Sequence, residues 1–159
     1  MKPNKETLRK LVVDYLNEAK LMQIATVKNN KPWVATVWYV HDEELNLYFI
    51  SRKSRRHSLE LKENPNIAGA ITKPYTIGSG EKVGGLQFEG KAHDLTDEPD
   101  TLEKIVKLYH GKYPKAEDIP LEKLTDPKWV ATFYVVHPKA FVLFDEVNFP
   151  DNPRQEFKL

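Results

Sequence analysis

Short segments with a two-residue hydrophobic period, separated by polar turns, dominate this sequence. That period is typical of β-strands, and the turns at 29–32 and 42–44 are short enough to join antiparallel neighbours. Two successive hairpins predict an antiparallel meander. The expected strands are Leu21–Lys28, Trp33–His41, Leu45–Ser51, Ile67–Thr72, Gly85–Leu95, Trp129–His137 and Ala140–Asn148.

Three segments carry apolar residues at helical spacing instead. The first spans residues 4–20, and Asn4 is a suitable N-cap for it. The other two span Ser54–Glu63 and Glu98–Tyr109. About seven strands with three to four helices around them predict a mainly β fold, an antiparallel barrel with flanking helices.

Length, charge and composition limit the classes of protein that this chain can belong to. A length of 159 residues suits a single domain over 1–159, with a polar, irregular tail at 149–159. The net charge of +1 creates no general attraction to nucleic acid or membranes, and no segment approaches the roughly 20 apolar residues of a membrane span. The absence of cysteine excludes disulfides and thiolate metal sites. The N-terminus lacks a signal peptide, so we expect a cytoplasmic protein.

The expected strand at 33–41 is apolar on both faces. Along 33–40, the odd-numbered and the even-numbered residues, which point to opposite faces, are both mostly apolar or aromatic. The segment Val130–Val136 is similar. A strand with one face in water normally alternates apolar with polar side chains. Both segments therefore need a cover on their outer face, either a helix or a partner subunit. We expect a homodimer.

A basic turn follows the expected third strand. The apolar run Leu47–Ile50 ends at Ser51, and a short helix begins a few residues later. Free N–H groups at a helix N-terminus attract anions, and arginine offers planar donors suited to phosphate. The turn therefore predicts a phosphate-bearing ligand, with a solvated basic turn as the alternative. Its basic residues are Arg52, Lys53, Arg55, Arg56 and His57.

Other motifs carry less information. The five histidines have no spacing typical of metal ligands, and we expect no metal site. No serine-hydrolase, P-loop or dinucleotide-binding motif is present. Gly84-Gly85 has two interpretations, either a β-bulge or a close approach of backbone to a flat ligand.

Three stretches together resemble a known family. They are the strand pair PWVATVWYV and NLYFIS, the basic turn and helix SRRHSLELKENP, and the strand GLQFEGKAHDLTD. In this order and spacing, they are similar to the pyridoxamine 5′-phosphate oxidase-like, FMN-binding split barrels. The C-terminal segment lacks the Trp and Arg motif of the family's oxidases. The resemblance therefore implies a divergent member rather than a pyridoxamine 5′-phosphate oxidase itself.

The resemblance also implies a set of cofactor-binding positions. In the family, one strand runs beside the flavin ring, and an Arg-Lys pair binds the phosphate; His57 stands at the lysine position here. The glutamine that the oxidases place near the ring matches Gly85, and Gln87 lies two residues further on. The implied cofactor residues are Thr36, Val37 and Trp38 beside the ring, Ile50 and Ser51 toward the ribityl phosphate, Arg56 and His57 at the phosphate, and Gln87.

The family resemblance implies an FMN-dependent oxidoreductase that acts on a small molecule of unknown identity. The flavin would carry out the hydride chemistry, so no catalytic residue is identified. The substrate is expected near the 73–83 loop, with Tyr75 and Lys82 as contacts. A flavin-, deazaflavin- or haem-binding protein without turnover is the alternative. An RNA-binding barrel is a more distant alternative, which the near-zero net charge disfavours.

Overall fold

The computed structural model describes residues 3–75 and 77–159. The helices and strands follow the order that the hydrophobic period predicts, with two additions near the C-terminal end. The elements are α1 Lys5–Glu18, β1 Leu21–Lys28, β2 Lys31–His41, β3 Leu47–Arg52, α2 Arg56–Glu63, β4 Asn66–Thr72, β5 Gly84–Asp94, α3 Pro99–Lys112, α4 Leu121–Leu124, β6 Ala131–Asp145 and β7 Arg154–Lys158.

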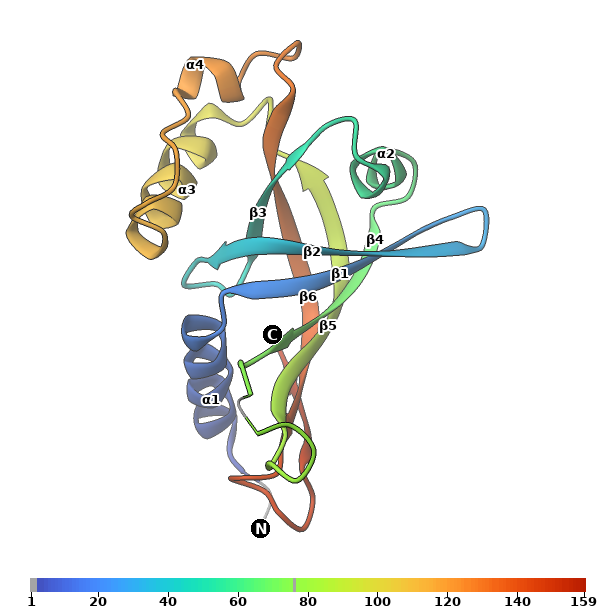
Figure 1. The fold of residues 1–159 in the computed structure, drawn as a ribbon, viewed down its shortest axis with the longest axis vertical. Coiled ribbons are helices and arrows are strands. Elements are labelled where there is room, and N and C mark those ends of the chain that lie inside the picture. Colours follow the sequence, from blue (N-terminus) through green and yellow to red (C-terminus); the bar gives the residue numbers. More distant parts are fainter. Residues whose placement is uncertain (1–2, 76) are drawn as a thin grey trace.

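The seven strands form one antiparallel sheet that closes into a barrel. Its order is β3-β2-β1-β4-β5-β6-β7, and an additional β3–β6 pairing closes the first six strands on themselves. In Figure 1, α1 lies beside the lower part of the barrel, while α2 and α3 lie on opposite sides of β3. The mainly β, antiparallel barrel fold is therefore confirmed.

Helix α1 begins where the sequence predicts. Asn4 is its N-cap, and the Asn4 side chain accepts a 2.8 Å hydrogen bond from the Thr7 backbone N–H. This bond satisfies one of the free donors of the first turn. Val12 and Leu16 are fully buried, and the Leu16 carbonyl accepts a 2.8 Å bond from the Tyr39 hydroxyl. Helix α1 thereby closes one end of the barrel.

The predicted strands at 129–137 and 140–148 are one strand, β6. The two predicted strands leave out Pro138 and Lys139, and proline is disfavoured in strand interiors because it lacks an N–H. The structure instead keeps β6 continuous through a β-bulge: Glu89 of β5 pairs with Ala140 and Gly90 pairs with Pro138, so the extra residue, Lys139, lies in β6. A Cβ at Gly90 would lie 2.2 Å from the His137 carbonyl oxygen, so only glycine fits this crossing.

The tail is not irregular as expected, because its residues 154–158 form β7. They pair with Ala140–Phe144 of β6. Phe157 is buried in the barrel core, whereas its neighbours in β7 are polar and at least partly exposed. A strand with a single buried residue has no visible two-residue period, which explains the wrong prediction.

Two hydrophobic clusters occupy the two faces of the sheet. The inner cluster fills the barrel and includes Tyr39 and Phe49. The outer cluster lies under α3 and includes Val40, Phe133 and Val135. Helix α3 therefore covers the outer face of the segment 131–136, and no partner subunit is needed there. Of the two segments expected to need a cover, β2 keeps large apolar side chains exposed on its outer face, Val34 and Trp38.

Within the described residues, no helix is long and apolar enough to cross a membrane.

Candidate cofactor site where β2 and β3 diverge

Strands β2 and β3 separate shortly after they meet. They pair only from His41↔Leu47 to Tyr39↔Phe49, and the described chain shows no register between them beyond that point. From there β2 pairs only with β1, whereas Ile50, Ser51 and Arg52 pair with β6. The facing backbone edges of the two strands are thus available to a ligand. This divergence lies at the positions that the family resemblance assigns to FMN.

Ser51 and His57 meet on the inner side of the divergence. The Ser51 Oγ lies 2.7 Å from the His57 Nε2, which joins the end of β3 to the first turn of α2. His57 is buried, and burial followed by the charge of Arg55 lowers its pKa below 6.5. At neutral pH the imidazole is therefore uncharged, and it contacts Ser51 as a neutral hydrogen-bonding group.

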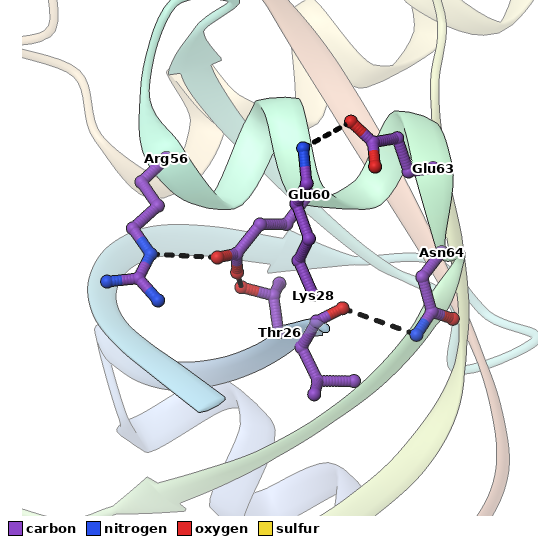
Figure 2. Close-up of polar contacts among 7 residues, drawn as sticks. Thr26, Lys28, Arg56, Glu60, Glu63 and Asn64 are labelled. Carbon is purple, nitrogen blue, oxygen red and sulfur yellow. Dashed lines mark hydrogen bonds and ion pairs between the residues drawn. The ribbon is translucent and has the colours of Figure 1, made fainter. Parts of the chain in front are cut away.

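Arg56 is held in place by two contacts. Its Nε donates a 2.8 Å hydrogen bond to the Glu60 Oε1 (Figure 2). Its guanidinium carbon lies 4.5 Å from the centre of the Trp33 ring. The buried Glu60 also accepts a 2.5 Å bond from the Thr26 hydroxyl. The Thr26 bond and then the Arg56 bond lower the pKa of Glu60, which keeps it charged at neutral pH. Arg56 thus presents a fixed cation, with its side chain still 46% exposed.

The surroundings of Arg56 add basic residues that the sequence did not identify. A cleft of about 410 Å³ beside Arg56 is lined by Ser54 and by Lys28 and Lys31 of the β1–β2 hairpin. Lys28 Nζ also contacts Glu63 Oε1 at 2.6 Å (Figure 2). The sequence places these lysines only at a turn. Nothing in it indicates that the turn packs beside α2.

The remaining predicted phosphate residues have different surroundings. No side chain caps α2, because the N-cap residue Arg55 makes no capping hydrogen bond. The first-turn N–H groups can therefore bind an anion. Lys53 donates to the backbone carbonyls of Asp126 and Pro127 at 3.2 and 3.3 Å, so it holds the connection before β6. Arg52 and Arg55 are exposed.

Trp38 and Ile50 meet on the outer side of the divergence. Both line a cavity of about 740 Å³ between the sheet and α3. Thr36 is also exposed, whereas Val37 points into the core and can offer a ligand only its backbone. A ligand in contact with both Trp38 and Ser51 would have to pass between β2 and β3, because these side chains project from opposite faces.

Gln87 lies apart from the other predicted residues. Thr36, Gln23, Ala70 and Gln87 form one row across β2, β1, β4 and β5. Three strand spacings put Gln87 roughly 14 Å from Thr36. Gln87 is exposed on the uncovered outer face of the sheet.

The Gly84-Gly85 pair is not a β-bulge. Both residues pair in regular register with β6, and a Cβ at Gly84 would lie 2.0 Å from the Tyr15 hydroxyl oxygen. Glycine is required there by Tyr15. The Tyr75 hydroxyl is also engaged locally, since it donates a 2.6 Å bond to the Gly84 carbonyl. Neither Tyr75 nor Lys82 lines a cavity shared with Trp38 or Arg56.

Comparison with known proteins agrees with this geometry. Residues 8–135 match the model of the pyridoxamine 5′-phosphate oxidase family. The chain belongs to this family. The UPF0306 protein of Yersinia enterocolitica is 25% identical over 109 residues, which are 67% of this chain and 71% of that protein. The UPF0306 protein of Haemophilus ducreyi is 23% identical over 131 residues, 79% of this chain and 88% of that protein.

Solved structures of the same fold show the same architecture at low identity. HutZ, the heme storage protein from Vibrio cholerae, has a TM-score of 0.66 at 16% identity and covers 82% of this chain and 89% of its own. A heme binding protein from Mycobacterium smegmatis has a TM-score of 0.72 at 13% identity, over 99% of this chain and 59% of its own. These matches show the fold, and the family resemblance is confirmed. Among the described residues, no group of three His, Asp or Glu side chains could hold a metal ion.

Proposed function

We propose that this protein binds FMN where β2 and β3 diverge and uses it in the oxidoreduction of a small molecule. Membership of the pyridoxamine 5′-phosphate oxidase family supports the proposal. The observation that carries it is the early end of the β2–β3 pairing, with phosphate donors on one side and an aromatic cavity on the other. The absence of cysteine is compatible with the cytoplasm, which we propose as its compartment.

The residues present fit a flavin mononucleotide. Ser51, Arg56 and the uncapped first turn of α2 would hold the phosphate, and His57 would orient the Ser51 hydroxyl. The backbone edge of β2 at Thr36–Trp38 would contact the ring, and Ile50 would lie toward the ribityl chain. The bound flavin would supply the hydride chemistry. The protein's own part is to hold the phosphate, orient the ring and exclude water from it.

A homodimer is part of this proposal. The outer face of β1, β2 and β4 presents small and apolar side chains with no covering helix. Val34 and Trp38 are 60% and 49% exposed, which is costly for large apolar groups gathered on one face. A second copy of the chain packed on this face would cover them and would contact Gln87.

Replacement of Arg56 tests the phosphate site. FMN titrated into apoprotein should bind, and Arg56→Ala should weaken binding about tenfold to a hundredfold, because a charge-assisted bond contributes about 1.5–3 kcal/mol. Arg9→Ala is the matched control, since Arg9 is a surface arginine whose Nη2 donates to the Glu43 carbonyl in the β2–β3 turn and which does not line the cleft beside Arg56. Equal affinity of the Arg56→Ala variant and wild type would place the phosphate elsewhere.

Haem is the second candidate, because two structural neighbours are described as heme proteins. His110 lines the cavity that holds Trp38 and Ile50, and its imidazole would bind the iron of a haem held there. Its Nε2 lies 3.4 Å from the Asp118 Oδ1. Haemin titration of wild type and His110→Ala separates the candidates. A shift of the Soret band that the variant abolishes would favour haem over FMN.

A further inference from the structure

A groove outside the cofactor site lies between α1 and α3. We propose that it binds a short apolar peptide whose free amino and carboxyl ends carry opposite charges. Its third wall is the β2–β3 turn at 42–46, which Figure 1 shows between the two helices. Its volume of about 1070 Å³ is close to the upper limit of small-molecule sites. Its described lining includes no residue proposed to bind FMN, so the two proposals stand or fall separately.

One side of each helix faces the groove. The lining residues of α1 are four positions apart, and those of α3 follow the spacing i, i+3, i+4, i+7, i+8 of a single helix face. Val13 of α1 and Leu108 of α3 supply aliphatic side chains, and Leu108 is 42% exposed. The described lining contains no Phe, Tyr or Trp. These walls favour a ligand with aliphatic side chains.

The turn beside the groove is fixed by its own contacts. The Asp42 carboxylate accepts bonds from the Asn46 backbone N–H at 2.8 Å and from the Tyr48 hydroxyl at 2.7 Å. Leu45 is buried and has a φ of 66°, in the left-handed region. The charge of Asp42 is thus satisfied within the turn, and the contacts of the turn fix the backbone that carries the next two residues.

Two of the four Lys and Arg residues that line the groove also have partners within the chain. The Lys107 Nζ lies 2.8 Å from the Glu103 Oε1, and the Lys112 Nζ donates a 3.0 Å bond to a backbone carbonyl of α1. Arg9 and Lys104 form no ion pair with any described residue. Their charges are therefore available to a ligand.

The charges available in the groove are of both signs. Glu43 and Glu44 of the turn line it and, within the described chain, form no ion pair either. The Arg9 Nη2 donates a 2.6 Å bond to the backbone carbonyl of Glu43 rather than to its carboxylate. A ligand with an ammonium group at one end and a carboxylate at the other would pair with both sets of charges at once.

A short apolar peptide combines these features. Its ammonium group would contact Glu43 and Glu44, and its carboxylate would contact Arg9 and Lys104. Its aliphatic side chains would lie between the two helices. An aliphatic ligand with a single charge would leave one of the two sets of charges unpaired.

Calorimetric titration with leucyl-leucine as the probe tests this assignment. We expect leucyl-leucine to bind. N-acetyl-leucyl-leucine and leucyl-leucine amide, which each lack one charge, should bind about two- to fivefold more weakly, the range that an exposed ion pair contributes. Glycylglycine, which has both charges and no apolar side chain, should bind at least tenfold more weakly.

Variants without charge assign the two ends of the peptide. In Glu43→Gln/Glu44→Gln, acetylation of the amino end should no longer change the affinity, because its partners are gone. In Arg9→Gln/Lys104→Gln, amidation of the carboxyl end should no longer change it, for the same reason.

Gly111→Phe tests the location without removing a charge. Gly111 lines the groove, and a Cβ there has no atom within 4 Å, so the phenyl ring would occupy the groove and should lower the affinity for leucyl-leucine at least tenfold. Glu6→Gln and Lys10→Gln are matched controls, because both residues are exposed on α1 and neither lines the groove.

Each outcome decides part of the inference. Absence of leucyl-leucine binding to wild type would overturn it. Equal affinity of leucyl-leucine and its two blocked forms, or an effect of acetylation that persists in Glu43→Gln/Glu44→Gln, would overturn the assignment of charges. Full affinity of a Gly111→Phe variant that thermal unfolding shows to be folded would place the peptide elsewhere.

Discussion

At the scale of single residues, Arg56 and His57 are neighbours that serve different contacts. Arg56 points toward Trp33 and Glu60, whereas the imidazole of His57 points inward to Ser51. The sequence treats them as one basic pair. The structure replaces that pair with a fixed guanidinium and an uncharged hydrogen-bonding group. In the proposed site, only Arg56 would provide charge to a phosphate at neutral pH.

The lowered pKa of His57 predicts how stability depends on pH. Burial keeps the folded imidazole neutral, so between its folded pKa and 6.5 the unfolded chain binds more protons. The free energy of unfolding should therefore fall as the pH drops below about 6.5. His41, whose pKa is lowered mainly by burial, adds to the same loss.

Urea unfolding of wild type and His57→Gln at pH 5, 6 and 7 measures this contribution. Glutamine can still bond to the Ser51 hydroxyl but does not titrate. We expect the variant to lose less stability between pH 7 and pH 5 than wild type does. Identical pH slopes for the two proteins would contradict the assignment of a depressed pKa to His57.

At the scale of helices and strands, the period of the sequence predicts most elements within two or three residues. It predicts α1 with its Asn4 cap, the β1–β2–β3 meander and α2 in this way. It fails where tertiary pairing overrides local signals. Pro138 stays within β6 because a bulge opposite Gly90 accommodates it, and β7 forms around one buried residue, Phe157.

The same contrast between local signals and tertiary packing decides which parts of the candidate site can be predicted from the sequence. Ser51, Arg56 and His57 could be found from the sequence because they are local to one strand end and one helix start. Lys28, Lys31 and the aromatic cavity could not, because they depend on which hairpin or helix packs against those elements. Gln87 and Thr36 lie on the same face of the sheet but three strand spacings apart. Only the order of the strands in the sheet reveals this separation.

The close approach of β6 to Gly90 of β5 can be tested by substitution. A Cβ there would lie 2.2 Å from the His137 carbonyl oxygen, so Gly90→Ala must shift the backbone and should lower stability by about 1–3 kcal/mol. Gly111→Ala is the control. That glycine lies in α3 with no atom within 4 Å of the added Cβ, and alanine should stabilise the helix by up to about 1 kcal/mol. Denaturant midpoints measure both changes, and an unaffected Gly90→Ala variant would contradict the register at the bulge.

At the scale of the whole molecule, the outer face of β1, β2 and β4 carries small and apolar side chains that no helix of the described chain covers. Helices α1 and α2 pack on the ends of the inner face, and α3 covers the outer cluster under Phe133 (Figure 1). The β1–β2 hairpin extends beyond the rest of the sheet in this view. A homodimer formed through this face would bury Val34 and Trp38 beside the proposed flavin ring.

A single charged substitution in the proposed interface tests the dimer. Sedimentation of wild type at micromolar concentration should give a dimeric mass, and Val34→Glu should give a monomer because it places a carboxylate in the apolar interface. Val147→Glu is the control, since Val147 is also 60% exposed but lies between β6 and β7. A monomeric wild type, or a dimeric Val34→Glu variant, would contradict the interface.

Flavin retention tests the central claim most directly. Apoprotein mixed with excess FMN and passed through a size-exclusion column should elute as a dimer, with the flavin absorption bands under the protein peak. Denaturation of that peak should release the flavin into solution, because the proposed site holds it without a covalent bond. Elution of the protein without any flavin absorption, with all FMN in the small-molecule fractions, would contradict the account.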